Sequence, residues 1–554
     1  MREAIVKALK ITGLSSEERE QFLETPRERE RGDYAFPCFV LASRLKKNPV
    51  EIAKELAKQI KLPKEFDKVE AVGPYLNFFV NRYFLAEQTV RTILKQKDKY
   101  GAIKPLRKET LVVELSSPNV AKPFGIGHLR STIIGNALAE IYRFLGHKVV
   151  TLNYLGDWGT PFGKIIAGYK AFGDEKALKL DPIGHLFDIY VKVTKDERFE
   201  AEGREWFRKL EDGDKEAMRF WKRFRDLSVK EFSKIYSLLG VNFDVLSGES
   251  HYTNKMGPVL DELKSKGLLV ESEGALVVNL EEYGFGVCLI KKSDGATLYA
   301  TRDLAAAIDR QKKYRATGLI YEVGSEQKLY FKQLFKILEL MGYKWASKCV
   351  HVDHGLYLDS DGKKFSTRKG KTIFMESVLD ETIELAKKEI MKRAQVSAKE
   401  CEKRALAIAR AAIFYGDLKN YRGHDMVFDI DRFVSFEGDT GPYLLYSYAR
   451  ARSILRKAGK NKDSKEGDIT DKEGALVGEL ARFPDVVLRA AEQYAPNLIA
   501  HYAYTLSQTF NEFYHTNKVI GSEEEVFRLQ LVHAFSQVLK NALHLLGISV
   551  LDEM

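Results

Sequence analysis

Residues 114–130 gather glycines and polar side chains that suit a nucleotide-phosphate site. The segment lies between a β-branched run and a helical pattern, where the N–H groups and the dipole of a helix start attract anions. Gly125 and Gly127 would let a nucleotide come close to the backbone. His128 offers a donor near the helix start, and Lys122 offers a mobile cation. The alternative is an ordinary strand-to-helix loop with a capping histidine, because short glycine motifs recur by chance.

A second cluster, Lys363–Lys371, combines basic side chains, hydroxyl groups and a glycine. Such a loop can clamp a pyrophosphate leaving group as negative charge develops on it. The alternative is a solvated basic loop that has no ligand.

The pattern around these clusters predicts a parallel α/β domain. A short strand at 111–115 precedes the glycine loop, and apolar positions from 129 to 141 follow on one face of a helix. A second strand, 147–152, comes after a glycine stop, and strand–loop–helix–strand is the start of a parallel sheet. The alternation continues to about residue 380, interrupted by a largely helical insertion near 175–245.

The two ends of the chain differ from this centre. The first ~100 residues read as a small α+β unit, with a helix around Ile52 and Leu56 and, within Val72–Val80, a strand entered through a Gly-Pro turn. From about residue 395 the pattern is almost all helix and finishes in an amphipathic stripe from Phe527 to Leu546. We therefore predict three domains, 1–105, 106–390 and 391–554.

Composition narrows the class of protein. The chain has 554 residues, 45% of them hydrophobic and 30% charged, and no apolar run approaches the ~20 residues that span a bilayer. Four cysteines without CxxC spacing argue against a structural metal and fit buried thiols in a reducing cytoplasm. The net charge of +10 favours polyanionic partners such as nucleic acid, although charge alone is a weak signal.

Two longer stretches resemble the catalytic signature of the arginyl-tRNA synthetases, a class I family: SSPNVAKPFGIGHLRSTIIGN and LNYLGDWGTPFG. GIGH stands where class I enzymes carry the HIGH motif, and KFSTR stands where they carry KMSKS. Further matches follow in order: SDGATLYATRDLAAAIDR, SEQKLYF, GDTGPYLLYSYARAR and LLGISVLDEM. The resemblance covers essentially the whole chain. It implies an α/β fold, a class I Rossmann-like catalytic domain, with an N-terminal α+β added domain and a C-terminal all-α anticodon-binding domain.

The resemblance also implies roles for individual residues. Phosphate and ATP contacts in the first cluster fall to Lys122, Pro123, Gly125, Gly127 and His128. The mobile second ATP loop corresponds to Lys364, Phe365, Ser366, Thr367 and Arg368. Of these, Lys122, His128, Lys364, Ser366 and Arg368 are the predicted catalytic residues.

The arginine pocket is implied in the same way. Glu114, Ser117 and Asn119 would hold the α-amino and nearby groups, and Tyr299, Asp303 and Gln327 would complete the pocket. The chemistry agrees, because a planar, permanently charged guanidinium needs a carboxylate that accepts paired hydrogen bonds. Tyr299 precedes Asp303 by one helical turn and shares its face. The alternative for Asp303 is an ion pair with Arg302 or Arg310.

The outer domains would bind tRNA. Tyr75 and Asn77 are the exposed-edge candidates for contact with the tRNA elbow, the alternative being that Tyr75 packs in the core. In the helical end, tyrosines alternate with arginines as single-stranded RNA loops prefer, and some of them must be core residues. The tRNA-binding candidates there are Tyr443, Tyr446 and Arg450, in a stretch that also holds Tyr448 and Arg452.

The implied activity is ATP-dependent activation of L-arginine and its transfer to tRNA(Arg) by a monomeric cytoplasmic enzyme, with Mg²⁺ accompanying ATP. Relatives usually have histidine where this chain has Gly125, and a histidine is common at Tyr330. One alternative is therefore a catalytically impaired paralogue that binds tRNA. Another is a class I synthetase for glutamate or cysteine, against which the missing CxxC and the pairing of Asp303 with Tyr299 argue.

Overall fold

The structure is a computed structural model that divides into two compact units. They comprise Met1–Tyr100, Ile454–Arg482 and Gln508–Val538 in one unit, and Gly101–Ser453, Phe483–Ser507 and Leu539–Met554 in the other. The described residues are 2–24, 26, 31–105, 107–292, 299–359, 361–363, 374–393, 395–428, 435, 437–458 and 469–554. Among them, no helix is long and apolar enough to cross a membrane.

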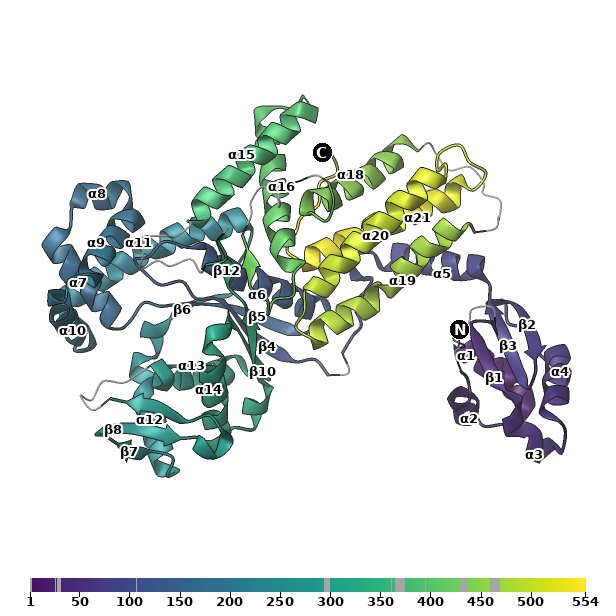
Figure 1. Ribbon diagram of the computed structural model, residues 1–554, viewed down its shortest axis with the longest axis horizontal. Coiled ribbons are helices and arrows are strands. Elements are labelled where there is room, and N and C mark those ends of the chain that lie inside the picture. The colour runs from purple at the N-terminus through teal and green to yellow at the C-terminus, as the bar shows by residue number, and fades with distance from the viewer. Residues whose placement is uncertain are drawn as a thin grey trace. The chain divides into compact units, whose positions relative to one another are not determined.

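The N-terminal part of the first unit is an antiparallel sheet of three strands with helices beside it (Figure 1). The strand order is β1 (Tyr34–Pro37), β3 (Tyr75–Val80) and β2 (Phe66–Val72), which makes β3 the central strand. The predicted strand is β3, and the Gly-Pro turn expected to lead into it lies at Gly73 and Pro74, where it joins β2 to β3. The helices include α1 (Arg2–Ala8), α4 (Pro49–Gln59) and α5 (Arg82–Gln96). Ile52 and Leu56 of α4 are buried, as predicted.

The second unit is built on a parallel sheet of five strands. In order across the sheet these are β11 (Cys349–His354), β10 (Gly318–Gly324), β4 (Thr110–Ser116), β5 (Lys148–Leu155) and β6 (Val245–Gly248). Helix α6 (Ile126–Phe144) follows β4 and lies close against it: a Cβ built on Gly135 would be 2.2 Å from the Leu115 Cβ. The chain winds outward from β4 in both directions, so the carboxyl ends of β4 and β10 form the switch point at which such sheets bind ligands.

The predicted helical insertion is present and consists of packed helices (Figure 1). They are α7 (Thr160–Phe172), α8 (Glu175–Leu180), α9 (Pro182–Thr194), α10 (Arg198–Glu211) and α11 (Lys215–Leu239). After β6 come the 3₁₀ helix η5 (Glu249–Lys255) and α12 (Met256–Ser265). A small antiparallel sheet follows, with β7 (Val270–Ser272), β8 (Ala275–Asn279) and β9 (Val287–Lys291). The next helices, α13 (Tyr299–Tyr314) and α14 (Lys328–Leu340), flank β10 in the chain.

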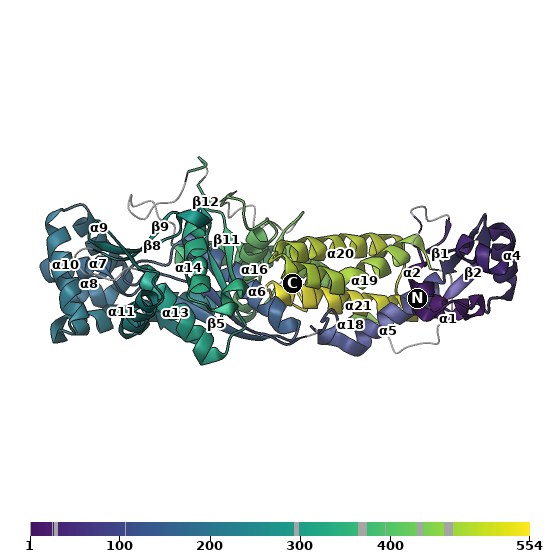
Figure 2. The same cartoon turned by 90° about the horizontal axis from the view of Figure 1, so that it is seen from below.

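The C-terminal part is helical, as predicted. Its helices are α15 (Met375–Arg393), α16 (Ala398–Leu418), α18 (Gly441–Lys457), α19 (Asp471–Glu492), α20 (Asn497–Thr516) and α21 (Glu525–Leu545). Figures 1 and 2 both show α19, α20 and α21 side by side. Phe510 of α20 stacks on Phe535 of α21 with ring centroids 3.7 Å apart, so the predicted amphipathic stripe is a packing face.

Candidate active site

The carboxyl ends of β4 and β10 bring predicted arginine-site residues to one edge of the sheet. Ser117 and Asn119 follow β4, and Gln327 ends the 3₁₀ helix η7 (Ser325–Gln327) that follows β10. Backbone pairing of Asn119 with Gly156 continues the contact of β4 with β5 beyond the strands. A Cβ on Gly156 would lie 2.3 Å from the Asn119 Oδ1, so only glycine leaves room for that amide. Asn119 and Gln327 are both exposed.

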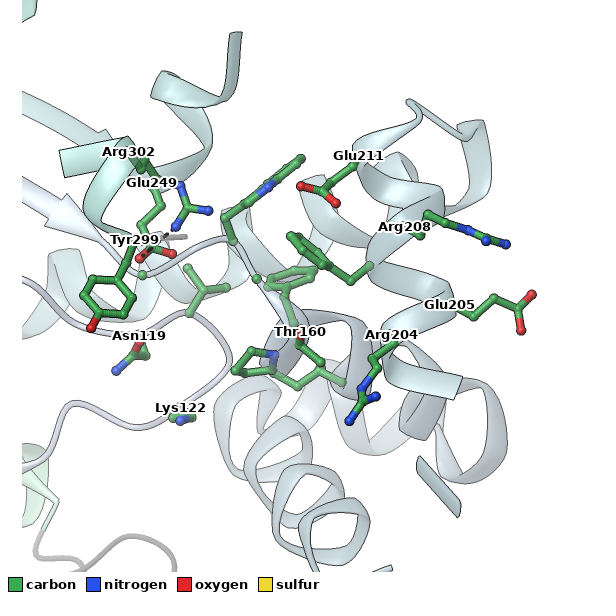
Figure 3. A pocket seen from close by; sticks show the side chains of 18 of the residues that line it. Asn119, Lys122, Thr160, Arg204, Glu205, Arg208, Glu211, Glu249, Tyr299 and Arg302 are labelled. Atoms are coloured by element: carbon green, nitrogen blue, oxygen red, sulfur yellow. Dashed lines mark ion pairs between the residues drawn. The ribbon is translucent and has the colours of Figure 1, made fainter. Parts of the chain in front are cut away.

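A cleft of about 1000 Å³ opens beside this edge (Figure 3). Of the predicted site residues, Asn119, Lys122 and Tyr299 line it. The opposite wall comes from α10 of the insertion and carries Arg204 and Arg208 (Figure 3). The remaining lining residues include Trp158, Gly159, Thr160, Pro161, Glu249, Lys292 and Arg302. The insertion is therefore part of the site, which the sequence pattern did not reveal.

The loop between β5 and α7 is fixed by a buried carboxylate. Asp157 is fully buried and accepts hydrogen bonds from the Ser250 N–H and hydroxyl at 2.9 and 2.7 Å. The Arg225 Nε of α11 lies 3.1 Å from the same carboxylate. Asp157 thus ties the insertion and η5 to the loop, and it holds Trp158 and the start of α7 at the cleft.

The first ATP cluster has the predicted helix-start geometry. Gly125 precedes α6 with φ −84° and ψ 164°, and its N–H donates to the His128 Nδ1 at 3.3 Å. Burial and the nearby charge of Lys122 lower the pKa of His128 to about 4, so this imidazole is neutral at pH 7. Gly127 is exposed, and a Cβ there would meet nothing within 4 Å, which leaves open space for a ligand. The Lys122 Nζ lies 4.2 Å from the ring centroid of Tyr190 in α9.

The predicted second ATP loop falls outside the part of the chain that the structure describes. Lys364, Phe365, Ser366, Thr367 and Arg368 lie outside the described residues. The chain after the loop is anchored to the first cluster, because the Met375 N–H donates to the Phe124 carbonyl at 3.0 Å. Gly125 also pairs through its backbone with Phe374. Phe374 and Met375 therefore lie beside the first cluster.

Asp303 sits where α13, α14 and β5 meet. Its Oδ1 accepts a hydrogen bond from the Tyr154 hydroxyl at 3.1 Å, and its Oδ2 accepts one from the Tyr330 hydroxyl. Burial raises the pKa of the Asp303 carboxyl, while the Tyr330 hydrogen bond and the charge of Arg310 hold it down. The Tyr299 ring packs edge-on against the Tyr330 ring with centroids 5.0 Å apart.

The alternative of an ion pair for Asp303 is not what the structure shows. Arg302 pairs with Glu249 at 3.4 Å, and Arg310 pairs with Glu114 at 2.6 Å. Among the described residues, no cationic side chain lies within ion-pair distance of Asp303. Glu114, predicted to hold the substrate amino group, is thus already paired with a buried arginine.

Glu249 is a carboxylate that lines the cleft, together with Glu205 and Glu211 of α10. Burial raises its pKa to about 7, although the charge of Arg302 opposes the shift. The described part of the chain contains no cluster of three or more His, Cys, Asp or Glu side chains that could hold a metal ion.

The prediction that Asn77 is exposed to contact tRNA is wrong. Asn77 is only 2% exposed, because β3 is the central strand and its side chain turns into the unit. Tyr75 is half-buried, and its ring packs edge-on against Phe39 with centroids 5.9 Å apart. Phe39 is itself exposed, so an aromatic pair faces solvent there.

In the helical end, exposure separates surface from core. Tyr446 is exposed, and the Arg450 guanidinium lies 4.8 Å from its ring centroid. Tyr443 is half-buried against Tyr504. Tyr448 is a buried residue, and Arg452 pairs with Asp552 at 3.0 Å. Tyr446 is therefore the exposed aromatic residue of the predicted RNA-binding stretch, and the half-buried Arg450 packs beside it.

Sequence reasoning missed Glu249, Tyr154 and Arg302 as cleft or pocket residues. Tyr154 belongs to the NYLGDWG stretch, which could have directed attention to it. Glu249 follows β6 without any local pattern, and only the strand order brings it to Arg302.

Three family models match the chain in succession. The model described as the arginyl tRNA synthetase N terminal domain matches residues 1–80. The model of tRNA synthetases class I (R), catalytic domain, matches residues 89–430, more than half of the chain. The DALR anticodon binding domain matches residues 444–554.

Relatives match over the full length. The chain is 47% identical over 544 residues to an arginine–tRNA ligase of Clostridium botulinum, covering 97% of this chain and 96% of the relative. It is 47% identical over 538 residues to arginine–tRNA ligase 2 of Bacillus anthracis, with 96% and 95% covered. Among solved structures, the arginyl-tRNA synthetase of Thermus thermophilus aligns with a TM-score of 0.77 at 26% identity, covering 100% of this chain and 99% of that one.

Proposed function

The chain belongs to the class I arginyl-tRNA synthetase family, and we propose on that basis that it activates L-arginine with ATP and transfers it to tRNA(Arg). The observation that carries the proposal is Asp303, a carboxylate held by two tyrosine hydroxyls and left without an internal cation in the described residues. A guanidinium is the cation that can satisfy such a carboxylate with two parallel hydrogen bonds.

In the proposed pocket, Asp303 receives the guanidinium and Tyr299 forms the wall beside it. Asn119 and Ser117 lie at the end of β4, where they are suited to the α-amino and carboxylate end of arginine. Gln327 approaches from the end of β10. Glu114 would act from behind this layer, since its carboxylate is already shared with Arg310.

The nucleotide side of the site is proposed to be the start of α6 with Lys122 and His128. The open space over Gly127 accommodates a ligand, and the helix dipole favours its phosphates. We expect Pro123 and Gly125 to shape this loop, and the segment containing Lys364, Ser366 and Arg368 to close on the pyrophosphate. Mg²⁺ is proposed to enter with ATP, because it keeps most of its water and binds phosphate oxygens with few protein ligands.

Two steps follow from this arrangement. The arginine carboxylate attacks the α-phosphate in line, which gives arginyl-adenylate and pyrophosphate. The 2′-hydroxyl of the terminal adenosine then attacks the adenylate carbonyl and releases AMP. The protein supplies position and charge rather than a nucleophile, so the acceleration comes from alignment and electrostatic stabilisation.

We propose that tRNA(Arg) contacts the exposed Phe39 ring with the half-buried Tyr75 beside it, and the surface of Tyr446 and Arg450. Aromatic rings and an arginine plane are suited to stack on unpaired bases. We further expect the enzyme to act as a monomer in the cytoplasm. The four buried cysteine thiols suit a reducing compartment.

None of the findings favours the impaired paralogue. The test is aminoacylation of tRNA(Arg) with each of the twenty amino acids, together with ATP–pyrophosphate exchange with and without tRNA. Charging with arginine alone supports the proposal. Binding of tRNA without exchange or charging would favour the paralogue, and charging with glutamate or cysteine would reassign the substrate.

A further inference from the structure

Tyr330 connects the two side chains that are proposed to bind the arginine guanidinium. It is the third residue of α14, and its hydroxyl donates to the Asp303 Oδ2. Its ring packs edge-on against Tyr299, which is 57% exposed at the cleft. One side chain from α14 therefore contacts both members of the pair that α13 presents.

The Asp303 carboxylate is held from both sides. Tyr154 of β5 donates to one oxygen at 3.1 Å, and Tyr330 donates to the other. An ionised carboxylate has about four acceptor positions, two on each oxygen. The two hydroxyls use one position on each oxygen and leave one on each, which is the number that a bidentate guanidinium requires.

The hydroxyls restrain Asp303 without neutralising it. Burial and the charge of Asp303 raise the pKa of Tyr330 well above its usual value, so the phenol stays protonated and donates its hydrogen. Burial does the same for Tyr154. A lysine or arginine in either place would restrain the carboxylate equally well but would compete with the substrate for its charge.

The neighbouring arginines are already committed. Arg310 lies 4.8 Å from the ring centroid of Tyr154 and pairs with Glu114, while Arg302 pairs with Glu249. Neither arginine can pair with Asp303 unless Glu249 or Glu114 loses its own ion pair. The negative charge of Asp303 is therefore kept for an incoming cation.

We propose that Tyr330 is a positioning residue for arginine recognition: it fixes the rotamer of Asp303 and supports the ring of Tyr299, and so sets the affinity for arginine but not for ATP. The proposal rests on the proposed function of the site. Its signature is a change in the KM for arginine with little change in kcat.

The test compares Tyr330→Phe with wild type in aminoacylation at saturating tRNA(Arg). Phenylalanine keeps the ring against Tyr299 and removes only the hydrogen bond. A hydrogen bond to a charged group is strong enough that its loss should raise the KM for arginine about tenfold or more. The KM for ATP and kcat should change less than about twofold, and the thermal midpoint should stay near that of wild type.

Tyr343→Phe is the matched control. The Tyr343 hydroxyl also donates to a carboxylate, that of Glu262 at 2.8 Å, but its ring packs against Trp345, and neither Tyr343 nor Glu262 belongs to the proposed arginine pocket. It should leave all three parameters unchanged. Tyr154→Phe is the second variant and should raise the KM for arginine as Tyr330→Phe does, since it frees the other oxygen of Asp303.

The outcomes are distinguishable. If wild type does not charge arginine, the proposed function fails. If wild type charges arginine but Tyr330→Phe keeps the arginine KM within twofold, the positioning role alone is overturned. Equal losses in the KM for arginine and for ATP, or the same loss in Tyr343→Phe, would show a general structural effect and overturn it as well.

Discussion

Two aspartates of the second unit, Asp303 and Asp417, have similar surroundings and differ in one hydrogen-bonding partner. Asp417 of α16 accepts a hydrogen bond from the Tyr357 hydroxyl, as Asp303 accepts one from Tyr330. Burial raises the pKa of both carboxyls. Asp417, however, also pairs with Arg130 of α6 at 3.3 Å, and both side chains are 1% exposed. Asp303 has a second tyrosine in place of the arginine.

The presence or absence of a paired arginine distinguishes Asp417, a structural carboxylate, from Asp303, which we propose binds the substrate. Arg130 completes Asp417 and also donates to the His424 carbonyl at 2.7 Å, so it joins α6 to the start of the helical part. At Asp303 the corresponding cation is missing among the described residues, and in our account the substrate supplies it. Burying a carboxylate without a cation is costly, which makes such a position a candidate for binding.

The largest expected effect is on stability and belongs to Asp417. Asp417→Asn should cost about 3–5 kcal/mol of unfolding free energy, because it removes the carboxylate with which the buried Arg130 pairs. Thermal or urea unfolding measures the loss. If this variant is as stable as wild type, Asp417 is not a structural partner of Arg130, and the comparison with Asp303 fails.

A smaller effect should follow from the carboxylate that is paired inside the cleft. Glu249 has a pKa of about 7, so it takes up a proton as the pH falls from 8 to 6 and leaves Arg302 unbalanced. The extra positive charge repels arginine, and the KM for arginine should rise about threefold over that range, since a partly exposed pair contributes at most about 1 kcal/mol.

Glu249→Gln provides the control for that pH dependence. The variant should show the raised KM at every pH between 6 and 8 and lose the pH dependence of the KM for arginine. A wild-type arginine KM that is flat from pH 6 to pH 8 would remove Glu249 from the pocket.

A change on the nucleotide side of the site should have no effect on the KM for arginine. The backbone at Gly125, with φ −84°, is open to any residue, so glycine is not required there for its conformation. Gly125→His would place an imidazole at the helix start, and we expect the rate of ATP–pyrophosphate exchange to rise by up to about tenfold. A tenfold change corresponds to about 1.4 kcal/mol, which is less than the roughly 3–4 kcal/mol that a well-placed oxyanion donor supplies. A slower exchange would show that packing around this buried position requires glycine, and a changed KM for arginine would mean that the two sides are not separate.

Local patterns predicted those parts of the site that depend on one element. The strand, loop and helix of 110–144 were predictable, as was the one-turn spacing of Tyr299 and Asp303, because both follow from periodicity within a single segment. Glu249 and the wall of α10 were not predictable, since the order of strands in the sheet and the packing of the insertion bring them to the cleft. Asn77 was misjudged for a related reason: alternation marks a strand but does not tell a central strand from an edge.

The central claim is that Asp303 is a carboxylate reserved for the substrate, and a matched pair of variants tests it most directly. The measurement is the dissociation constant of L-arginine, by calorimetry, for wild type, Asp303→Asn and Asp417→Asn, together with the thermal midpoint of each. We predict that Asp303→Asn weakens arginine binding by about 2–5 kcal/mol, leaves the KM for ATP unchanged and does not lower the midpoint. Asp417→Asn should lower the midpoint and bind arginine as wild type does. An Asp303→Asn variant that binds arginine within twofold of wild type, or that loses stability as Asp417→Asn does, would contradict the account.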